Sequence, residues 1–471
     1  MSYNKPLKAE ERIAQLVDAN SFNEFKSPSP TGYLTGSGKI AGKKVYISAI
    51  VSEELPVNVF AGLQHHLALL ETALLHPAPV ILIIDLPGHQ ASSNQSPFPQ
   101  NPAKLLADKR GIGHWYALHA KLSGKVPQIC VVCGKIGASM TFPITLCDTV
   151  VMLETAGMSI GRPDVVEKII GEKVAYEQLG GAVMHAKISG SVDKVVKTEQ
   201  AAFAYVRQYL TFFPQFSGGQ LPSCEPGYPL TDSANIAKLI PNNPNMAFDI
   251  HALIKALVDS EQLLEIRPDF AGETITALGK IEGKIVGIIA NNSQCRGGVF
   301  FPESCRKTTR FVSLCDSFGI PLLFLADSAG FMVGSQAEQA GIIREASLMF
   351  NTIANTTVAK LSVAVRRDYT AGVYAMGGPG MNPESFIALP TAVISIYGKG
   401  VADKLAGSNL SQNAASNMAE MLDAASDPQA LYAAGLIDEI IQPENLRQRI
   451  SQFLTAKQQG EKASKKTILL V

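Results

Sequence analysis

The chain repeats one sequence pattern in its two halves. Gly38-Lys-Ile-Ala-Gly-Lys43 recurs about 240 residues later as Gly279-Lys-Ile-Glu-Gly-Lys284, and a β-rich run follows each copy. Each run leads to a helical stretch and then to a strand that ends in an Asp-x-x-Gly turn, beginning at Asp85 in the first half and at Asp327 in the second. Because these features recur in the same order and at nearly constant spacing, they predict an internal duplication.

A further helix and strand lead in each half to a turn of small residues, Gly137-Ala-Ser139 in the first and Thr370-Ala-Gly372 in the second. Strands that alternate with helices are typical of a largely parallel sheet covered by helices. We therefore expect two tandem α/β domains, residues 1–213 and 248–471. Residues 214–247 between them are rich in Pro, Gly, Ser and Asn, and this composition indicates a linker.

The composition is that of a globular protein. Of the 471 residues, 46% are hydrophobic and 17% are charged, which favours a large buried core. The formal net charge is zero, so nothing favours a nucleic acid or an anionic membrane surface as the partner. Met1–Glu10 lack the apolar region of a signal peptide, and Val80–Ile84 and Pro321–Ala326 are too short to span a bilayer. We expect a cytoplasmic protein with no membrane segment, whose Lys-rich last dozen residues, ending in Ile468–Val471, form a loosely held tail.

The cysteines and histidines do not predict a metal or redox site. Seven cysteines, an odd number spread over the chain, lack the pattern of a disulfide framework. Cys130 and Cys133 form a Cys-x-x-Cys motif, but they belong to an apolar run that reads as a buried strand, so we interpret both as core residues. His114 and His119 are not spaced as a helical ligand pair, and we expect them to be packed or solvent-facing.

The small-residue turns are the main candidates for chemistry. A turn that follows a strand and opens a helix points backbone N–H groups outward, and a glycine there lets a ligand approach them. Such donors can stabilise the oxyanion of a thioester enolate. The alternative is that the small residues only permit close packing of helix on strand. Finding equivalent turns in both halves favours the functional reading, because carboxyl transfer needs two oxyanion-stabilising elements.

Other catalytic signatures are absent from this sequence. It has no Gly-x-Ser-x-Gly, no His-Glu-x-x-His and no P-loop. Asp85 and Asp327 could orient loops or act on protons, but we expect both to cap the turns that they begin, because Asp readily accepts from nearby backbone N–H groups.

The second half carries a series of recognisable stretches in order along the chain: Gly297-Gly298-Val299, Thr309–Val312, Cys315–Pro321, Asp327–Glu338, Gly341–Arg344, Arg367–Met376 and Leu389–Ala392. Through these stretches it resembles the carboxyltransferase (beta) subunit of biotin-dependent acyl-CoA carboxylases. The first half is similar to the same family through shorter stretches: Glu11-Arg-Ile13, Leu16–Phe22, Pro163–Val166, Glu177–Ala182, His185 and Ser189-Gly190. The resemblance covers nearly the whole chain and implies a crotonase-like (ββα-spiral) fold in both halves.

The same resemblance implies where the site residues lie. In this family acyl-CoA uses the first half and carboxybiotin the second, at an interface between two subunits. The donors on the biotin side would be the backbone of Ala371 and Gly372. The thioester donors would fall within Gly137, Ala138 and Ser139. The pocket on the biotin side would include Gly297, Gly298, Gly330, Phe331 and Tyr374. A tyrosine at position 374 suits the methylcrotonyl- and glutaconyl-type pattern, and the alternative is simple core packing.

Cofactor and partners follow from the resemblance as well. No biotin-attachment segment of the Met-Lys-Met type is present in this sequence, so biotin would arrive on a partner, a biotin carboxylase or biotin carrier subunit. The substrate would be a coenzyme A thioester. A site shared between subunits implies a homo-oligomer, from a dimer to a hexamer.

The first half departs from the family pattern at two stretches. Val51–Val59 contains no glycine, and Asp85–Gln90 replaces a Gly-rich turn. The second stretch, with Asp108–Gly113 and Gly134-Lys135, looks more like the gamma subunit of biotin-independent malonate decarboxylase. Three functions therefore stay open: a biotin-dependent acyl-CoA carboxyltransferase, a biotin-independent decarboxylase of a malonyl-type thioester on CoA or an acyl carrier protein, and a non-catalytic scaffold.

Overall fold

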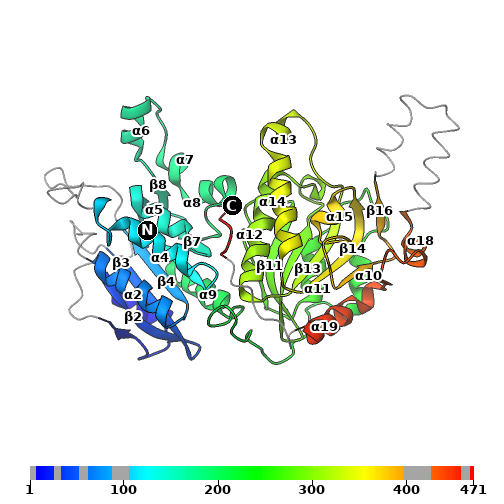
Figure 1. Cartoon of the computed structure of the whole chain (residues 1–471), viewed down its shortest axis with the longest axis horizontal. Helices are drawn as coiled ribbons and strands as arrows, with labels where there is room; N and C mark the ends of the chain where they lie inside the picture. The colour runs from blue at the N-terminus through cyan, green and yellow to red at the C-terminus, as the bar shows by residue number, and fades with distance from the viewer. Residues whose placement is uncertain are drawn as a thin grey trace. The chain divides into compact units, whose positions relative to one another are not determined.

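The chain forms two compact units (Figure 1). The computed structural model describes residues 7–25, 33–51, 62–86, 106–396, 426–457 and 467–470. Unit 1 contains Met1–Gln220 and Lys465–Leu470, and unit 2 contains Leu221–Ser464 and Val471. The finer boundaries proposed above, with a linker at residues 214–247, stay a prediction.

The sheet of unit 1 has the strand order β1-β2-β3-β4-β5-β7-β9. The first three strands pair antiparallel, and every later neighbour pairs parallel. A separate parallel pair, β6 with β8, follows the end of β5. The strands are β1 (Asn23–Glu24), β2 (Tyr33–Ile40), β3 (Lys43–Val51), β4 (Val80–Asp85), β5 (Gln128–Val132), β6 (Lys135–Gly137), β7 (Thr149–Leu153), β8 (Gly157–Ser159) and β9 (Lys194–Val196).

Helices cover both faces of this sheet. α2 and α4 pack on one face, whereas α1 and α9 contact each other and pack on the strands from the other. The helices are α1 (Ala9–Leu16), α2 (Leu63–Leu75), α4 (Ile112–Leu122), α5 (Thr141–Thr145), α6 (Pro163–Ile170), α7 (Tyr176–Gly180), α8 (Ala182–Met184) and α9 (Glu199–Leu210).

Unit 2 repeats the arrangement, with the strand order β10-β11-β12-β13-β14-β15-β17 and β16 paired to β14. Its strands are β10 (Leu263–Glu265), β11 (Thr274–Ile281), β12 (Lys284–Asn291), β13 (Leu322–Ser328), β14 (Lys360–Tyr369), β15 (Ser385–Ala388), β16 (Val393–Ser395) and β17 (Glu439–Ile440). Its helices are α10 (Ile236–Leu239), α11 (Ile250–Leu257), α12 (Pro302–Phe318), α13 (Ser335–Gln339), α14 (Ile342–Asn355), α15 (Gly372–Ala375), α18 (Pro428–Ala433) and α19 (Leu446–Lys457).

The two predicted hairpins have the same turn. Ala41 and Gly42 join β2 to β3 with φ values of +48° and +77°, and Glu282 and Gly283 join β11 to β12 with +49° and +75°. Positive φ at both central residues defines the turn that matches the twist of a two-residue hairpin. The Gly-Lys repeat in the sequence therefore encodes the same hairpin twice.

An aspartate holds each hairpin turn from the preceding helix. In unit 1 the carboxylate of Asp18, just after α1, accepts from the N–H groups of both turn residues, at 3.0 and 2.8 Å. In unit 2 Asp259, just after α11, accepts from the equivalent two N–H groups at 2.9 and 2.8 Å. A shared side-chain contact of this kind supports the duplication independently of the repeated sequence.

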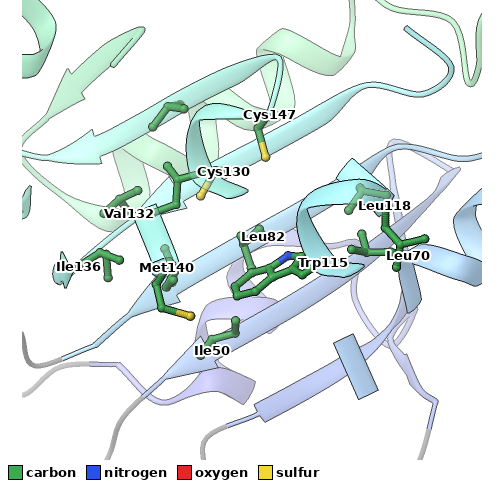
Figure 2. Close-up of a cluster of buried hydrophobic side chains, with 14 of the residues drawn as sticks. Ile50, Leu70, Leu82, Trp115, Leu118, Cys130, Val132, Ile136, Met140 and Cys147 are labelled. Carbon is green, nitrogen blue, oxygen red and sulfur yellow. The ribbon is translucent and has the colours of Figure 1, made fainter. Parts of the chain in front are cut away.

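The core of unit 1 surrounds the single tryptophan (Figure 2). Figure 2 shows Trp115 of α4 beside Leu82 of β4, with Leu70 and Leu118 close to it. Cys130 belongs to the same buried cluster. Cys133 is buried as well, so the interpretation of the Cys-x-x-Cys motif as core is confirmed.

In unit 2 one face of the sheet carries α11 and α19, and the other carries α12. Ile254 of α11 and Ile450 of α19 share a buried cluster with Ile288 and Leu323 of the strands. The preceding residue of β12, Gly287, faces the other way, because a Cβ there would lie 2.6 Å from Cys315 Sγ on α12. None of the helices that the structure describes is long and apolar enough to cross a membrane.

The expectation of a loose tail is wrong for Thr467–Leu470. Ile468 is only 2% exposed, and its backbone N–H donates to Ser123 Oγ of unit 1 at 3.2 Å. Composition predicted a solvated tail because the residues before it are lysine-rich, but the apolar Ile468 finds a buried position 345 residues away in sequence.

Candidate active site

The predicted biotin-side residues converge where β13 and β14 end. Gly330 follows β13, and the turn Thr370–Gly372 follows β14, which is the parallel neighbour of β13. A Cβ on Gly372 would lie 3.1 Å from the Cα of Gly330, and a Cβ on Gly330 would lie 2.4 Å from Thr370 Oγ1. The two turns therefore touch through their backbones, and this close approach requires glycine at both positions.

The backbone at these turns is strained. Gly330 has a φ of +96° and Thr370 a φ of +54°. A β-branched residue such as threonine is rarely found with positive φ. Strain of this kind costs about 1–3 kcal/mol and persists where the surrounding structure imposes it, commonly at functional sites. The sequence analysis passed over Thr370 because residue type alone gives no sign of its φ.

Two backbone donors of the turn are unpaired. The N–H of Thr370 donates to Ser395 O of β16 at 3.0 Å, and that of Val373 donates back to Thr370 O at 3.4 Å. The N–H groups of Ala371 and Gly372 between them meet no acceptor in the part of the chain that the structure describes. Two neighbouring unpaired donors can bind an anionic oxygen.

Ser328 connects the glycine turns, and the sequence analysis missed it. Its hydroxyl donates to Gly298 O at 2.9 Å and accepts from the N–H of Gly330 at 3.0 Å. Gly298 itself has a φ of +71°, and a Cβ there would lie 2.8 Å from Asp327 O. Gly298 thus lies against the end of β13, next to the Gly330 turn, and its place in a biotin pocket stays a prediction.

Asp327 is held by two arginines and does not cap its own turn. Its carboxylate accepts from Arg366 at 2.7 Å and from Arg367 at 3.0 Å, and both Asp327 and Arg366 are fully buried. Arg367 also donates to Gly297 O at 3.0 Å. The expectation of a turn cap is therefore wrong for Asp327, because both of its carboxylate oxygens are taken by the two arginines. These ion pairs fix the strand ends that carry the turns.

Phe331 and Tyr374 each follow one of the paired turns in sequence. The Phe331 ring stacks on Phe300 with centroids 5.2 Å apart, and its edge meets Phe350 at 5.6 Å. Tyr374 on α15 is 47% exposed, so the alternative that it is a packed core residue is wrong. Phe331 with its ring partners and the exposed Tyr374 lie close in sequence to turns with unpaired N–H groups. Such surroundings suit a flat polar ring better than a metal ion.

In unit 1 the predicted turn Gly137–Ser139 begins at the last residue of β6 and ends just before α5. Gly137 is paired with Ser159 of β8. Ser139 O accepts a hydrogen bond from the hydroxyl of Tyr116 on α4, which fixes the turn against the core. Asp85, at the end of β4, pairs with Arg12 at 2.6 Å, and Arg12 also binds Glu199 of α9 at 2.7 Å. From residue 87 on, the turn that Asp85 begins lies outside the described residues, so the expected cap by Asp85 stays a prediction.

A pocket of about 560 Å³ lies beside this turn. Its wall is mostly apolar and comes from α5, β8 and α6, with Val166, Ile169 and Ile170 among the lining residues. His185 also lines it, with Nε2 2.7 Å from Met158 O and Nδ1 2.8 Å from Ser189 Oγ. Burial lowers the pKa of His185, which favours a neutral ring that orders the pocket wall.

The two histidines considered as ligands in the sequence, His114 and His119, have structural partners. His114 pairs with Glu71 at 3.1 Å, and His119 is buried with Nδ1 2.7 Å from Gln128 Oε1. Burial raises the pKa of the Cys133 thiol, which opposes thiolate chemistry. Among the residues that the structure describes, no group of three or more His, Cys, Asp or Glu could hold a metal ion. The two stretches that depart from the family pattern lie largely outside the described residues, at 52–59 and 87–90.

The carboxyl transferase domain family matches residues 64–468, so the chain belongs to this family. It is a carboxyltransferase of the biotin-dependent acyl-CoA carboxylases, with the crotonase-like fold in both of its domains. The family assignment from short motifs is thereby confirmed.

Three similar proteins illustrate the relationship. An uncharacterized carboxylase of Bacillus subtilis, YngE, is 40% identical over 374 residues, which are 78% of this chain and 71% of that protein. The propionyl-CoA carboxylase beta chain of Cereibacter sphaeroides is 30% identical over 476 residues, 95% of this chain and 89% of its own. The crystal structure of transcarboxylase 12S, described as a hexamer assembly with methylmalonyl-coenzyme A bound, superposes with a TM-score of 0.86 at 28% identity, covering 97% of this chain and 92% of that one.

Proposed function

We propose that this chain transfers a carboxyl group between carboxybiotin, carried on a separate protein, and an acyl-CoA thioester. The observation that carries the proposal is the pair of unpaired N–H groups of Ala371 and Gly372. They lie at a strained turn that contacts Gly330, in a family of carboxyltransferases. Carboxybiotin supplies the carboxyl group when it is bound.

The residues of the turn fit an oxygen that gains negative charge. If carboxybiotin bound here, the N–H groups of Ala371 and Gly372, already oriented, would stabilise negative charge on its ureido oxygen without reorganising. The loss of one such donor typically costs ~2.7–4 kcal/mol of the barrier. Asp327 with Arg366 and Arg367 keeps the two strand ends in place, so that the donors stay fixed through the reaction.

On the other side of the reaction, we assign the acyl thioester to unit 1. Gly137, Ala138 and Ser139 would supply backbone donors to the thioester oxygen. The apolar pocket next to this turn would take the acyl chain, because Val166, Ile169 and Ile170 offer it an environment without charge. In this proposal His185 holds the wall of the pocket and takes no proton from the substrate.

The partner of this reaction is a biotin carboxylase or a biotin carrier subunit. We propose that the chain works as a homo-oligomer in the cytoplasm, since the family shares its active site between subunits and the related transcarboxylase 12S is described as a hexamer assembly. Methylmalonyl-CoA is a suitable first substrate, because it is the thioester bound in that relative.

Carboxyl exchange between methylmalonyl-CoA and free biotin tests the proposal directly. We expect exchange that depends on biotin and that falls by about 10²–10³-fold in Gly372→Val, because the added side chain would collide with Gly330 and displace the donors. Gly113→Val is the matched control, because no atom lies within 4 Å of a Cβ at Gly113.

The other two functions give different results. Release of carbon dioxide with biotin rigorously absent, at the same rate as with biotin, would instead identify a decarboxylase. No turnover with a panel of malonyl-type thioesters on CoA or acyl carrier protein, from a folded protein, would identify a scaffold.

A further inference from the structure

Asp368 is a buried carboxyl group that the proposed reaction does not use. It lies in β14, three residues before Ala371, and its exposed fraction is 0%. Neither carboxyl oxygen has a hydrogen-bond partner among the residues that the structure describes. A carboxylate in such a place would carry an uncompensated charge away from water, which is among the most costly arrangements in a protein.

The groups around Asp368 are already engaged. In the strand register it lies beside Ser328 of β13 and Ile394 of β16. The Ser328 hydroxyl is taken by Gly298 and Gly330, as described above. Within the neighbouring elements β15, β16 and α15, the exposed Tyr374 has the only titratable side chain.

The nearby charges are unfavourable to a second anion. The arginines on its own strand, Arg366 and Arg367, both donate to Asp327 of β13. Asp327 is therefore the only one of the two carboxyl groups that these arginines neutralise. Burial first, and the charge of Asp327 second, raise the pKa of Asp368 to about 8. The neutral acid is the form that the folded protein holds at neutral pH.

Ionisation would change what the turn offers. Aspartate side chains commonly accept from backbone N–H groups two or three residues further along the chain. Two residues on, the N–H of Thr370 is already taken by Ser395 O, and three residues on, that of Ala371 is unpaired and is one of the two donors of the proposed site. A carboxylate at position 368 would compete with the substrate for the Ala371 donor and would repel an anionic oxygen at both donors.

We propose that Asp368 is a positioning residue, whose carboxyl group must stay protonated for the Ala371 and Gly372 donors to remain available to substrate. This inference rests on the proposed function. It gives a role to a residue that the sequence analysis left without one, and it adds a limit on the reaction at alkaline pH. Asp368 does not contact substrate in this account. It acts through the turn.

The test is the pH profile of carboxyl exchange in the full-length protein and in Asp368→Asn, which has nearly the same shape but cannot ionise. In the wild type we expect kcat/KM to fall about tenfold between pH 7 and pH 9, the change in protonated fraction for a pKa of about 8. In Asp368→Asn the same fall should be absent. Asp232→Asn, at an exposed aspartate, should keep the wild-type profile. Identical profiles for wild type and Asp368→Asn would overturn the proposal.

A stability measurement separates this proposal from the proposed function. The pKa of Asp368 is higher in the folded than in the unfolded chain, so the folded state binds the extra proton. Stability should therefore fall as pH rises from about 4 to 8 in the wild type relative to Asp368→Asn, and then level off. If this difference is seen while no exchange activity is found, the proposed function fails, but the protonated state of Asp368 in the folded protein is confirmed. If the difference is absent, the inference on Asp368 fails whatever the activity.

Discussion

Gly330→Ala is the substitution for which the structure makes the sharpest prediction. Alanine at a φ of +96° costs about 1–2 kcal/mol in backbone conformation. Its Cβ would also lie 2.4 Å from Thr370 Oγ1 and 3.3 Å from Tyr369 O, so the Thr370–Gly372 turn must move. Displacement of one donor from the turn should lower carboxyl exchange by about 10²–10³-fold, with a ~2.7–4 kcal/mol higher barrier.

Gly341→Ala separates the contact from the backbone cost. Gly341 has a similar φ of +84°, but no atom lies within 4 Å of a Cβ there. Gly341→Ala should lose about 1–2 kcal/mol of stability in urea unfolding, Gly330→Ala should lose at least as much because of the added collision, and only Gly330→Ala should lose activity. The double variant Gly330→Ala/Thr370→Gly should recover part of the rate, because the colliding Oγ1 is gone. Equal activity losses in the two single variants, or none in Gly330→Ala, would refute the role given to the turn contact.

Two further predictions concern stability, both measured by urea unfolding. Thr370→Gly should stabilise the protein by ~1 kcal/mol, because it removes a β-branched residue from a φ of +54°, and a loss of stability would show that Thr370 makes contacts that outweigh its strain. Arg12→Met should destabilise by about 3–5 kcal/mol, since it leaves the carboxylates of Asp85 and Glu199 without their buried partner. Arg110→Met, which breaks an exposed pair, should cost at most about 1 kcal/mol, and similar losses in the two arginine variants would contradict the argument from burial.

The sequence predicted the fold well because the same short-range turn and strand patterns occur twice along the chain. The Gly-Lys hairpins need residues that tolerate positive φ at fixed positions, and Gly42 and Gly283 mark those positions directly. Family motifs likewise located the turn that contains Ala371 and Gly372. The turn after β6 was found in the same way, although its role in binding a thioester stays a prediction.

Side-chain partners were less predictable, because they come from distant parts of the chain. Asp85 was assigned to its own turn, yet its partner Arg12 lies 73 residues away. Nothing in the spacing of two such residues reports their approach. Asp368 carried a readable sign, since the charged run from Arg366 to Asp368 interrupts an otherwise apolar strand. The sequence could not show that Asp368 is the neutral residue of this run, because that conclusion depends on its burial and on the hydrogen bonds of the two arginines.

The buried position of Ile468 has a consequence for how the chain is made. Residues up to Gln220 leave the ribosome first, but Ser123 in this unit acquires its bond to the Ile468 N–H only after 345 more residues have been added. During synthesis the Ile468 site of unit 1 therefore stays open until all the residues of unit 2 up to Ser464 have been added. A gene fragment that stops at Gln220 would encode unit 1 without its C-terminal segment Lys465–Leu470. That segment would have to be supplied as a separate peptide.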